Sequence, residues 1–383
     1  MLKVLAVFGT RPEAIKMAPL IKELEKHPGR IECKVAVTAQ HREMLDQVLD
    51  LFQITPAYDL NIMMPNQTLY EITARALTGL NEILEQEKPD IVLVHGDTTT
   101  TFAAGLAAFY RQIKVGHIEA GLRTGNKYSP YPEEMNRRLT GAIADLHFAP
   151  TATAKANLLR EGVNPENILV TGNTVIDALL ATVKDKYVFT DAALNAIDYR
   201  GSRVLVVTTH RRENLGEPLR NVYEALRDIV EQYNNVEVVF PVHKNPKVRN
   251  IVESVLGGLP RVHLTDPLEY APFVSLMNKA YLVLTDSGGL QEEAPALGKP
   301  VLVLRDTTER PEAIDAGTVR MVGTDKDAVF NACKTLLEDS AAYEKMANAV
   351  NPYGDGRACA RITAGLEYFF GLRGNKPEEF INL

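Results

Sequence analysis

The feature that most constrains this chain is a repeated alternation of short apolar runs with longer segments of helical periodicity. In the first half, runs rich in aliphatic residues cover 2–8, 32–38, 90–95, 114–118, 146–149 and 168–170. Segments with helical spacing lie between them, at 13–26, 42–52, 69–87, 99–110 and 133–144. Apolar strands that alternate with helices are typical of parallel sheets covered by helices on both faces. The pattern therefore predicts an α/β fold with a doubly wound, Rossmann-like sheet.

The same alternation starts again in the second half, after a polar segment at about residues 184–203. The new apolar runs cover 203–208, 236–241, 261–264, 281–285, 300–304 and 318–321. A length of 383 residues also favours two cores over one. We expect Rossmann-like domains at 1–184 and 185–355, and a last helix within 356–383 that crosses back to the first domain. Two such domains would face a central cleft, with ligands at the carboxyl ends of the strands.

Composition narrows the class of partner. The formal net charge of −7 argues against nucleic acid, which normally requires a basic surface. The three cysteines, Cys33, Cys333 and Cys359, are odd in number and lack metal-ligand spacing. No apolar run reaches the length of a membrane span or a signal peptide. We expect a soluble cytoplasmic protein that contacts neither membrane nor nucleic acid and binds no metal.

Carboxylates follow two consecutive strands of the first half. Asp97 stands in the segment HGDTT, and Glu119 in HIEAGLR. Two carboxylates at neighbouring strand ends suit a general acid and a general base. Glu133, at the start of the predicted helix 133–144, is a third candidate. Two structural alternatives stay open: Asp97 could cap the helix that begins at Thr99, and Glu133 could serve only the helix dipole.

Other segments indicate an anionic ligand. The first strand ends in a turn that leads into a helix and carries Arg11 and Lys16, but it lacks the G-x-G-x-x-G spacing, which speaks against NAD. The second half offers His210 in THRREN and Arg310 in TTERPE. Its most specific signal is TDSGGLQEE, residues 285–293, where small residues at a helix start let backbone N–H groups approach a phosphate. Glu293 in this segment suits a ribose diol.

In these segments the sequence resembles the non-hydrolysing bacterial UDP-N-acetylglucosamine 2-epimerases. The similarity covers nearly the whole chain and is carried by FGTRPEAIKMAPL from Phe8, HGDTTTT from His95, GHIEAGLRTG from Gly116, TDSGGLQEEAPALGKP from Thr285 and RDTTERPEA from Arg305. The resemblance implies a two-domain fold of the glycosyltransferase type B kind, a homodimer, and no metal or nicotinamide cofactor. It implies interconversion of UDP-N-acetylglucosamine and UDP-N-acetylmannosamine for surface polysaccharide synthesis.

The resemblance also implies roles for individual residues. The substrate site would include Arg11, Lys16, Asp97, Glu119 and His210. UDP would contact Ser287, Gly288 and Gly289 at phosphate, Glu293 at the ribose, Arg310 at the diphosphate, and Phe273 and the main chain of Leu268 at the uracil. A second, effector-binding site for UDP-N-acetylglucosamine would include Gln40, His41, Glu43, Glu134, Arg211 and His243.

The chemistry of carbon 2 limits the mechanisms by which the implied reaction can proceed. The proton on carbon 2 has no adjacent carbonyl to acidify it, and transient oxidation needs a nicotinamide. The remaining route is elimination of UDP, loss of the carbon-2 proton to give a glycal, and re-addition with protonation on the other face. Asp97, Glu119, Glu133 and His210 are the predicted catalytic residues. A hydrolysing 2-epimerase, a glycosyltransferase of the same fold and a catalytically silent nucleotide-sugar sensor remain as alternatives.

Overall fold

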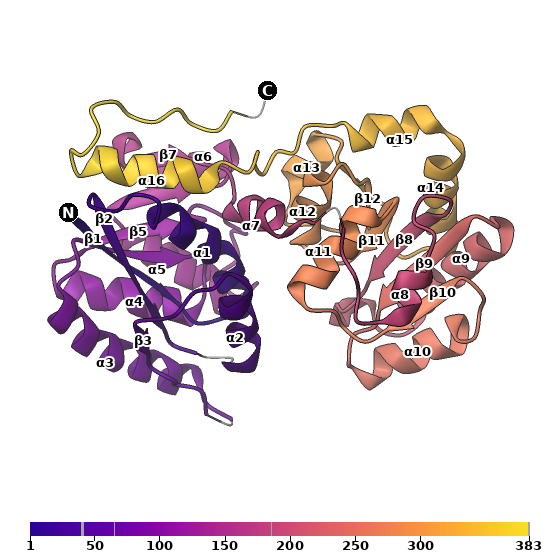
Figure 1. The fold of residues 1–383 in the computed structure, drawn as a ribbon, viewed down its shortest axis with the longest axis horizontal. Helices are drawn as coiled ribbons and strands as arrows, with labels where there is room; N and C mark the ends of the chain where they lie inside the picture. The colour runs from indigo at the N-terminus through magenta and orange to yellow at the C-terminus, as the bar shows by residue number, and fades with distance from the viewer. Residues whose placement is uncertain (40–41, 65, 185, 382–383) are drawn as a thin grey trace. The chain divides into compact units, whose positions relative to one another are not determined.

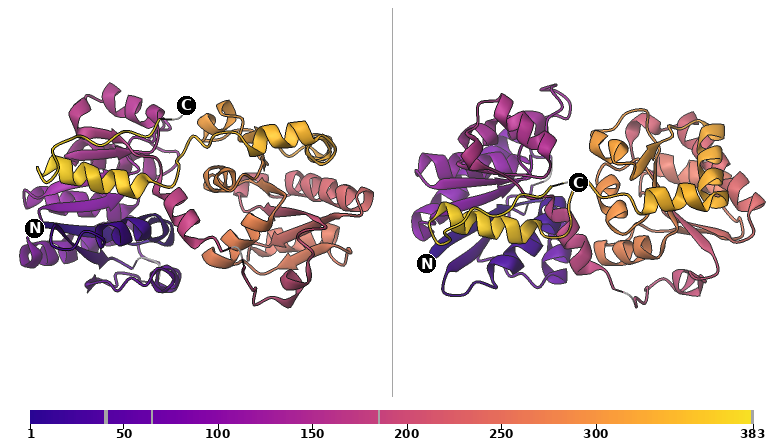
Figure 2. Two further views of the ribbon diagram at one scale, coloured as in Figure 1. Left: turned by 45° about the horizontal axis from the view of Figure 1, so that its top comes forward. Right: turned by 90° about the horizontal axis from the view of Figure 1, so that it is seen from above.

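The computed structural model describes residues 1–39, 42–64, 66–184 and 186–381. The chain divides into two compact units (Figures 1 and 2). Unit 1 comprises Met1–Ala181 together with Tyr353–Asn382, and unit 2 comprises Thr182–Pro352. The first unit is therefore completed by the last segment of the chain, and the polar segment predicted as a linker belongs to unit 2, where it contains the short helix α8 (Ala192–Ala196).

Unit 1 contains a parallel seven-stranded sheet of order β3-β2-β1-β4-β5-β6-β7. Its strands are β1 (Leu2–Phe8), β2 (Ile31–Val37), β3 (Tyr58–Asp59), β4 (Ile91–His95), β5 (Lys114–Ile118), β6 (Leu146–Ala149) and β7 (Ile168–Val170). The sequence did not predict β3, because this strand has only two residues, one of them charged, and so contains no apolar run. This strand lies at the edge of the sheet, where it pairs only with β2 among the described strands.

Helices cover both faces of this sheet. They are α1 (Arg11–Leu24), α2 (Arg42–Leu51), α3 (Leu69–Glu87), α4 (Thr99–Tyr110), α5 (Glu133–Ile143), α6 (Ala152–Arg160), η1 (Pro165–Asn167), α7 (Thr174–Thr182) and α16 (Ala358–Phe369). Helix α1 begins two residues before its predicted start, since Pro12 fits the first helical turn. Helix α16 begins two residues after its predicted start, since Gly356 has a φ of +76° that no α-helix contains.

The core of unit 1 follows the two-residue period of the strands. Val4, Ala6 and Phe8 of β1 pack with side chains of α1, α2 and α16 in one apolar cluster. The alternate residues Leu5 and Val7 pack with α3 and α4 in a second cluster on the opposite face. Because both faces are buried, the strand reads as a continuous apolar run, as the sequence predicted. The helices of both layers pack on the faces of the sheet, and polar loops lie at the carboxyl ends of the strands.

Unit 2 repeats this architecture with a parallel six-stranded sheet of order β10-β9-β8-β11-β12-β13. The strands are β8 (Arg203–Thr208), β9 (Val236–Pro241), β10 (Val262–Thr265), β11 (Leu282–Thr285), β12 (Val301–Val303) and β13 (Val319–Met321). Besides α8, the helices are η2 (Arg212–Asn214), α9 (Glu217–Gln232), α10 (Pro246–Leu256), α11 (Tyr270–Lys279), α12 (Leu290–Ala296), α13 (Pro311–Asp315), α14 (Lys326–Glu338) and α15 (Ser340–Ala347). The α/β fold with two Rossmann-like parallel sheets is confirmed.

Candidate functional site

Glu119 is the centre of a polar cluster at the carboxyl ends of β4, β5 and β7. It directly follows β5 and is 9% exposed. Its carboxylate forms an ion pair with Lys16 of α1 and accepts a hydrogen bond from Asn173 Nδ2 at 2.8 Å. Its φ is +61°, a left-handed conformation that costs a residue with a side chain about 1–3 kcal/mol. A buried acid held in such a conformation is characteristic of functional sites.

His95 lies near the same oxygen of this carboxylate. Its Nε2 is 3.9 Å from Glu119 Oε2, beyond hydrogen-bond length, and has no hydrogen-bond partner among the described residues. Burial lowers the pKa of His95 to about 4, against a smaller opposing effect of the Glu119 carboxylate. His95 therefore remains a neutral imidazole at physiological pH, so it adds no second positive charge beside Lys16.

Asp97 follows β4 and is held by helix α5. Arg137 donates to Asp97 Oδ2 from Nε at 2.9 Å and approaches it with Nη2 at 2.7 Å, and Asn136 Nδ2 donates to the Asp97 carbonyl at 2.9 Å. The alternative that Asp97 caps the following helix is wrong. Thr98 is the N-cap of α4, and its hydroxyl accepts the Thr101 N–H at 3.1 Å. The carboxylate of Asp97 is thus free of capping and is 26% exposed.

Glu133 is the first residue of α5, after a Pro132 cap that forms no side-chain hydrogen bond. Its side chain is half-buried. Of the site cations, Arg11 begins α1 and Lys16 lies on the same helix, so one helix presents both at the end of β1. In the described ranges, Arg11 has no carboxylate within ion-pair distance, whereas Lys16 is paired with Glu119.

Glu13 is a site residue that the sequence analysis missed. It is 2% exposed, and its carboxylate accepts hydrogen bonds from the backbone N–H groups of Gly9 (3.1 Å) and Thr10 (2.8 Å). It also accepts from the hydroxyls of Thr10 (2.8 Å), Thr98 (2.7 Å) and Thr101 (3.1 Å). Burial raises its pKa, and these hydrogen bonds oppose the rise. One carboxylate thereby joins the turn after β1 to the turn after β4, which carry Arg11 and Asp97.

In unit 2, Asp286 organises the residues after β8. It is fully buried and accepts the backbone N–H groups of His210 and Arg211, each at 2.9 Å, and His210 Nδ1 also at 2.9 Å. Burial alone would raise the pKa of Asp286, but the hydrogen bonds and the adjacent imidazole outweigh it and lower the pKa. An ionised Asp286 therefore fixes the ring of His210, whose side chain is 42% exposed.

The predicted phosphate segment lies between β11 and α12. Gly289 is the N-cap of α12, and the space beside Gly288 and Gly289 contains no heavy atom closer than 3.7 Å to an added Cβ. Arg310 is held by an ion pair with Glu292, a nearly buried residue of α12. Glu293 is 9% exposed and accepts the Tyr270 hydroxyl at 3.2 Å. Ser287, the glycines, Arg310 and Glu293 thus surround one end of α12.

The predicted uracil contacts are both half-buried. Phe273 lies on α11, and Leu268 precedes that helix by two residues. Tyr270, on the first turn of α11, bonds to Glu293 of α12. This bond brings the start of α11 next to the phosphate segment.

Of the predicted effector residues, Gln40, His41 and the side chain of Glu43 lie outside what the structure describes. Glu134 is fully buried, and its carboxylate accepts the N–H groups of Thr124 (3.0 Å) and Gly125 (3.3 Å) and two arginine side chains. In unit 2, the rings of His243 and His210 have centroids 6.4 Å apart, and Arg211 is adjacent in sequence. The effector site stays a prediction.

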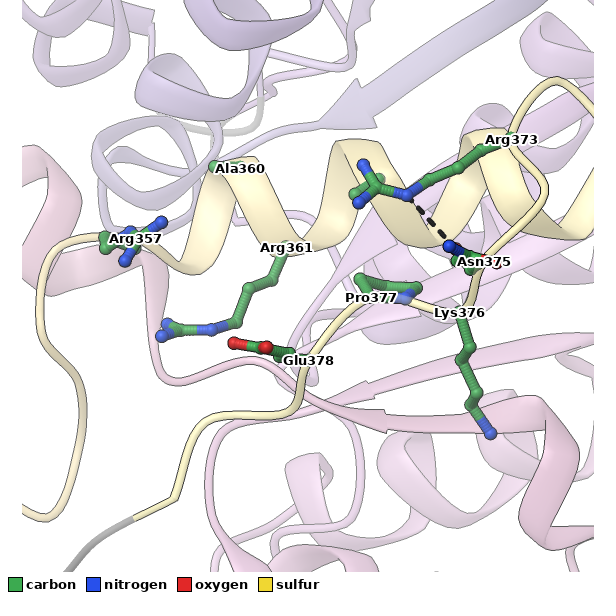
Figure 3. A pocket seen from close by; sticks show the side chains of 9 residues that line it. Arg357, Ala360, Arg361, Arg373, Asn375, Lys376, Pro377 and Glu378 are labelled. Atoms are coloured by element: carbon green, nitrogen blue, oxygen red, sulfur yellow. Dashed lines mark hydrogen bonds between the residues drawn. The ribbon is translucent and has the colours of Figure 1, made fainter.

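A groove of about 420 Å³ lies in unit 1 between α16 and the segment at residues 373–378 (Figure 3). None of the predicted site residues lines it. Of its cations, Arg361 is bound to Asp355 by two hydrogen bonds of 2.7 Å and donates to the Thr171 carbonyl at 3.2 Å. Arg361 thereby ties α16 to the end of β7, next to Asn173.

The described part of the chain contains no group of three or more metal-ligating side chains. It also contains no helix with the length and hydropathy required to cross a membrane.

Unit 1 contains a doubly wound parallel sheet with candidate catalytic carboxylates after its strands, and unit 2 contains a second such sheet with a candidate phosphate-binding segment after one strand. This combination defines an α/β protein of the glycosyltransferase type B-like class. The family model for UDP-N-acetylglucosamine 2-epimerase matches residues 22–367. The chain belongs to the UDP-N-acetylglucosamine 2-epimerase family.

Individual relatives are similar over nearly the full length. The chain is 58% identical over 380 residues to the UDP-N-acetylglucosamine 2-epimerase of Bacillus subtilis (strain 168), which covers 99% of this chain and 98% of that protein. The crystal structure of a putative UDP-N-acetylglucosamine 2-epimerase from Listeria monocytogenes matches with a TM-score of 0.94 and 54% identity over 99% of each chain. The enzyme from Neisseria meningitidis, solved bound to UDP-GlcNAc, matches with a TM-score of 0.86 and 55% identity over 96% of this chain and 100% of that chain.

Proposed function

We propose that this protein catalyses the reversible epimerisation of UDP-N-acetylglucosamine to UDP-N-acetylmannosamine without hydrolysing it. The observation that carries the proposal is the buried Glu119, strained at φ +61° and paired with Lys16, in a chain that belongs to this family. The relative from Neisseria meningitidis, solved with UDP-GlcNAc, supports the choice of substrate.

The reaction begins with cleavage of the bond between carbon 1 and the UDP oxygen, whose electron pair leaves with UDP. Cations and backbone donors favour this step because they stabilise the negative charge that develops on the diphosphate. Arg310, Ser287, Gly288 and Gly289 of unit 2 are assigned this role, with Arg11 of unit 1. The ion pair with Glu292 fixes Arg310 before the substrate arrives.

A carboxylate then removes the proton from carbon 2, which is acidic beside the oxocarbenium-like carbon 1, and a glycal forms. Re-addition of UDP at carbon 1, with protonation of carbon 2 on the opposite face, completes the epimerisation. Asp97, Glu119 and Glu133 are assigned to proton exchange, and His210, oriented by Asp286, to a proton transfer to or from UDP.

Product analysis tests this proposal against its rivals. Purified protein incubated with UDP-N-acetylglucosamine should form UDP-N-acetylmannosamine, with total nucleotide sugar unchanged. Release of UDP with free N-acetylmannosamine would instead identify a hydrolysing 2-epimerase. Turnover only when a sugar acceptor is added would identify a glycosyltransferase, and binding without turnover would identify a sensor.

The biological setting is also a proposal. We assign the enzyme to the cytoplasm, where nucleotide sugars for surface polysaccharides are made, and to a homodimer. The adjacent exposed side chains of Phe109 (56% exposed) and Tyr110 (66%), at the end of α4, support a contact surface on unit 1. Light scattering of the purified protein at micromolar concentration tests the dimer.

A further inference from the structure

Asn173 contributes to the Glu119 cluster in a fixed orientation. Its side-chain Oδ1 accepts the Val175 N–H at 3.1 Å, so the amide group must present Nδ2 to Glu119, to which it donates at 2.8 Å. The orientation of the amide follows from these two bonds, because a flipped amide would point an N–H at an N–H and an oxygen at a carboxylate. Asn173 is only 2% exposed, so water has little access to compete for these bonds.

The backbone of Asn173 is anchored as firmly. Its N–H donates to the Tyr353 carbonyl at 2.7 Å, and Tyr353 is buried. The preceding Gly172 has a φ of +82°, and a Cβ there would lie 3.2 Å from the Cα of Gly354. The turn after β7 therefore packs directly on the loop that returns the chain to unit 1. Arg361 adds a hydrogen bond to the Thr171 carbonyl in the same turn.

This anchored amide faces a carboxylate whose own position is strained. Among the described residues, Lys16 from α1 and His95 from β4 bring titratable groups close to the Glu119 carboxylate, and the imidazole is neutral. Lys16 has a long flexible side chain, whereas Asn173 has a short one fixed at both ends. A donor aimed at a carboxylate favours its ionised form and also sets the direction of its oxygens.

We propose that Asn173 is a positioning residue that holds Glu119 ionised and oriented for proton exchange with the sugar. The inference rests on the proposed function, since it concerns how the general base of that reaction is held. It assigns a role to the end of β7, which contributes no residue to the predicted site. The competing explanation is purely structural: Asn173 precedes α7, and its Oδ1 satisfies the Val175 N–H at the start of that helix.

The substitution Asn173→Asp separates the two explanations. Aspartate accepts the Val175 N–H as well as asparagine does, so the helix start is retained. The substitution removes the N–H donor, however, and places a second carboxylate next to Glu119. Two carboxylates at this distance do not both ionise readily, so one of them binds a proton near neutral pH. Asn164→Asp is the matched control, because Asn164 also accepts a backbone N–H at a helix start in unit 1, at an exposed position.

We expect Asn173→Asp to lower kcat roughly 10²-fold at pH 7.5, the scale of a misplaced catalytic group. The affinity for UDP and the thermal unfolding temperature should stay close to those of the wild type and of Asn164→Asp. The loss should shrink as the pH is raised, since the shared proton is then released. A purely structural defect would not change with pH in this way.

Wild-type kcat in Asn173→Asp between pH 6 and 9 would overturn the inference and leave the proposed function intact. A pH-independent loss that parallels a fall in unfolding temperature would also overturn it. If the Asn173→Asp variant folds poorly, Asn173→Ser serves as the second variant, because serine keeps an acceptor at the helix start without adding charge. A kcat of Asn173→Ser above half of the wild-type value would contradict the inference. If the wild type itself does not epimerise the substrate, both proposals fail together.

Discussion

Three buried histidines make unit 1 sensitive to mild acid. Burial is the main cause that lowers the pKa of His95 to about 4, of His117 to about 3 and of His147 to about 4. In the unfolded chain a histidine titrates near pH 6.5. A histidine whose pKa is lowered by folding contributes stability above pH 6.5, and that stability is lost as the pH falls from 6.5 towards the folded pKa.

The size of the effect follows from the width of this window. One pKa unit corresponds to about 1.4 kcal/mol, so at pH 5.0 each of the three histidines reduces the free energy of unfolding by about 2 kcal/mol. Together they remove about 6 kcal/mol, a large fraction of the 5–15 kcal/mol that stabilises a typical protein. The buried carboxyls of Glu13 and Asp177, whose pKa values are raised mainly by burial, act in the opposite direction as the pH falls and offset part of this loss.

The assay is urea unfolding at pH 7.5 and pH 5.0, followed by hydrogen exchange of peptides from each unit. The variant His147→Gln removes one titrating group, so its loss of unit 1 stability between the two pH values should be smaller than that of the wild type by about 2 kcal/mol. His263→Gln, at a half-buried position in unit 2, is the control and should leave the unit 1 difference unchanged. Equal differences in wild type and His147→Gln would refute the reasoning.

Three further predictions concern the site. Glu13→Ala should destabilise unit 1 by about 2–4 kcal/mol in urea unfolding, because it leaves buried N–H donors of Gly9 and Thr10 unpaired. Glu13→Gln keeps one acceptor and should destabilise unit 1 less. An equal loss of stability in both variants would contradict the role assigned to the Glu13 carboxylate. Arg310→Ala should weaken UDP binding in calorimetry by about 10–100-fold through the lost charge-assisted hydrogen bond, whereas the exposed Arg320→Ala should not; an unchanged affinity in Arg310→Ala would remove it from the diphosphate site. The amide substitutions Asp97→Asn, Glu119→Gln and Glu133→Gln should each lower turnover by roughly 10²–10⁴-fold with UDP affinity retained. Near-normal turnover in all three variants would exclude these carboxylates from proton transfer.

The sequence predicted the central strands well because strands such as β4 and β8 are buried on both faces and read as continuous apolar runs. The same strands predicted where Asp97 and Glu119 lie, since polar residues that follow parallel strands collect at one edge of the sheet. Asn173 follows β7 in the same manner, so the same rule applied to that strand would have found it. A neutral amide in a turn simply carries less chemical signal than a carboxylate.

Residues that act through long-range contacts were beyond the sequence. Glu13 reads as an ordinary residue of a first helical turn, and only the structure brings it to Thr98 and Thr101, 85 and 88 residues away. Asp286 reads as part of the phosphate segment, and its bonds to His210 cross 76 residues. The capping alternative for Asp97 failed for a local reason, since the next residue, Thr98, is itself a good N-cap.

The measurement that tests the central claim most directly is isotope exchange at carbon 2. Purified protein and UDP-N-acetylglucosamine are incubated in heavy water without added metal or nicotinamide, and the sugar is followed by NMR. Proton exchange through a glycal predicts deuterium at carbon 2 of both UDP-N-acetylglucosamine and UDP-N-acetylmannosamine, with UDP still attached. Formation of the epimer without deuterium at carbon 2 would contradict the account.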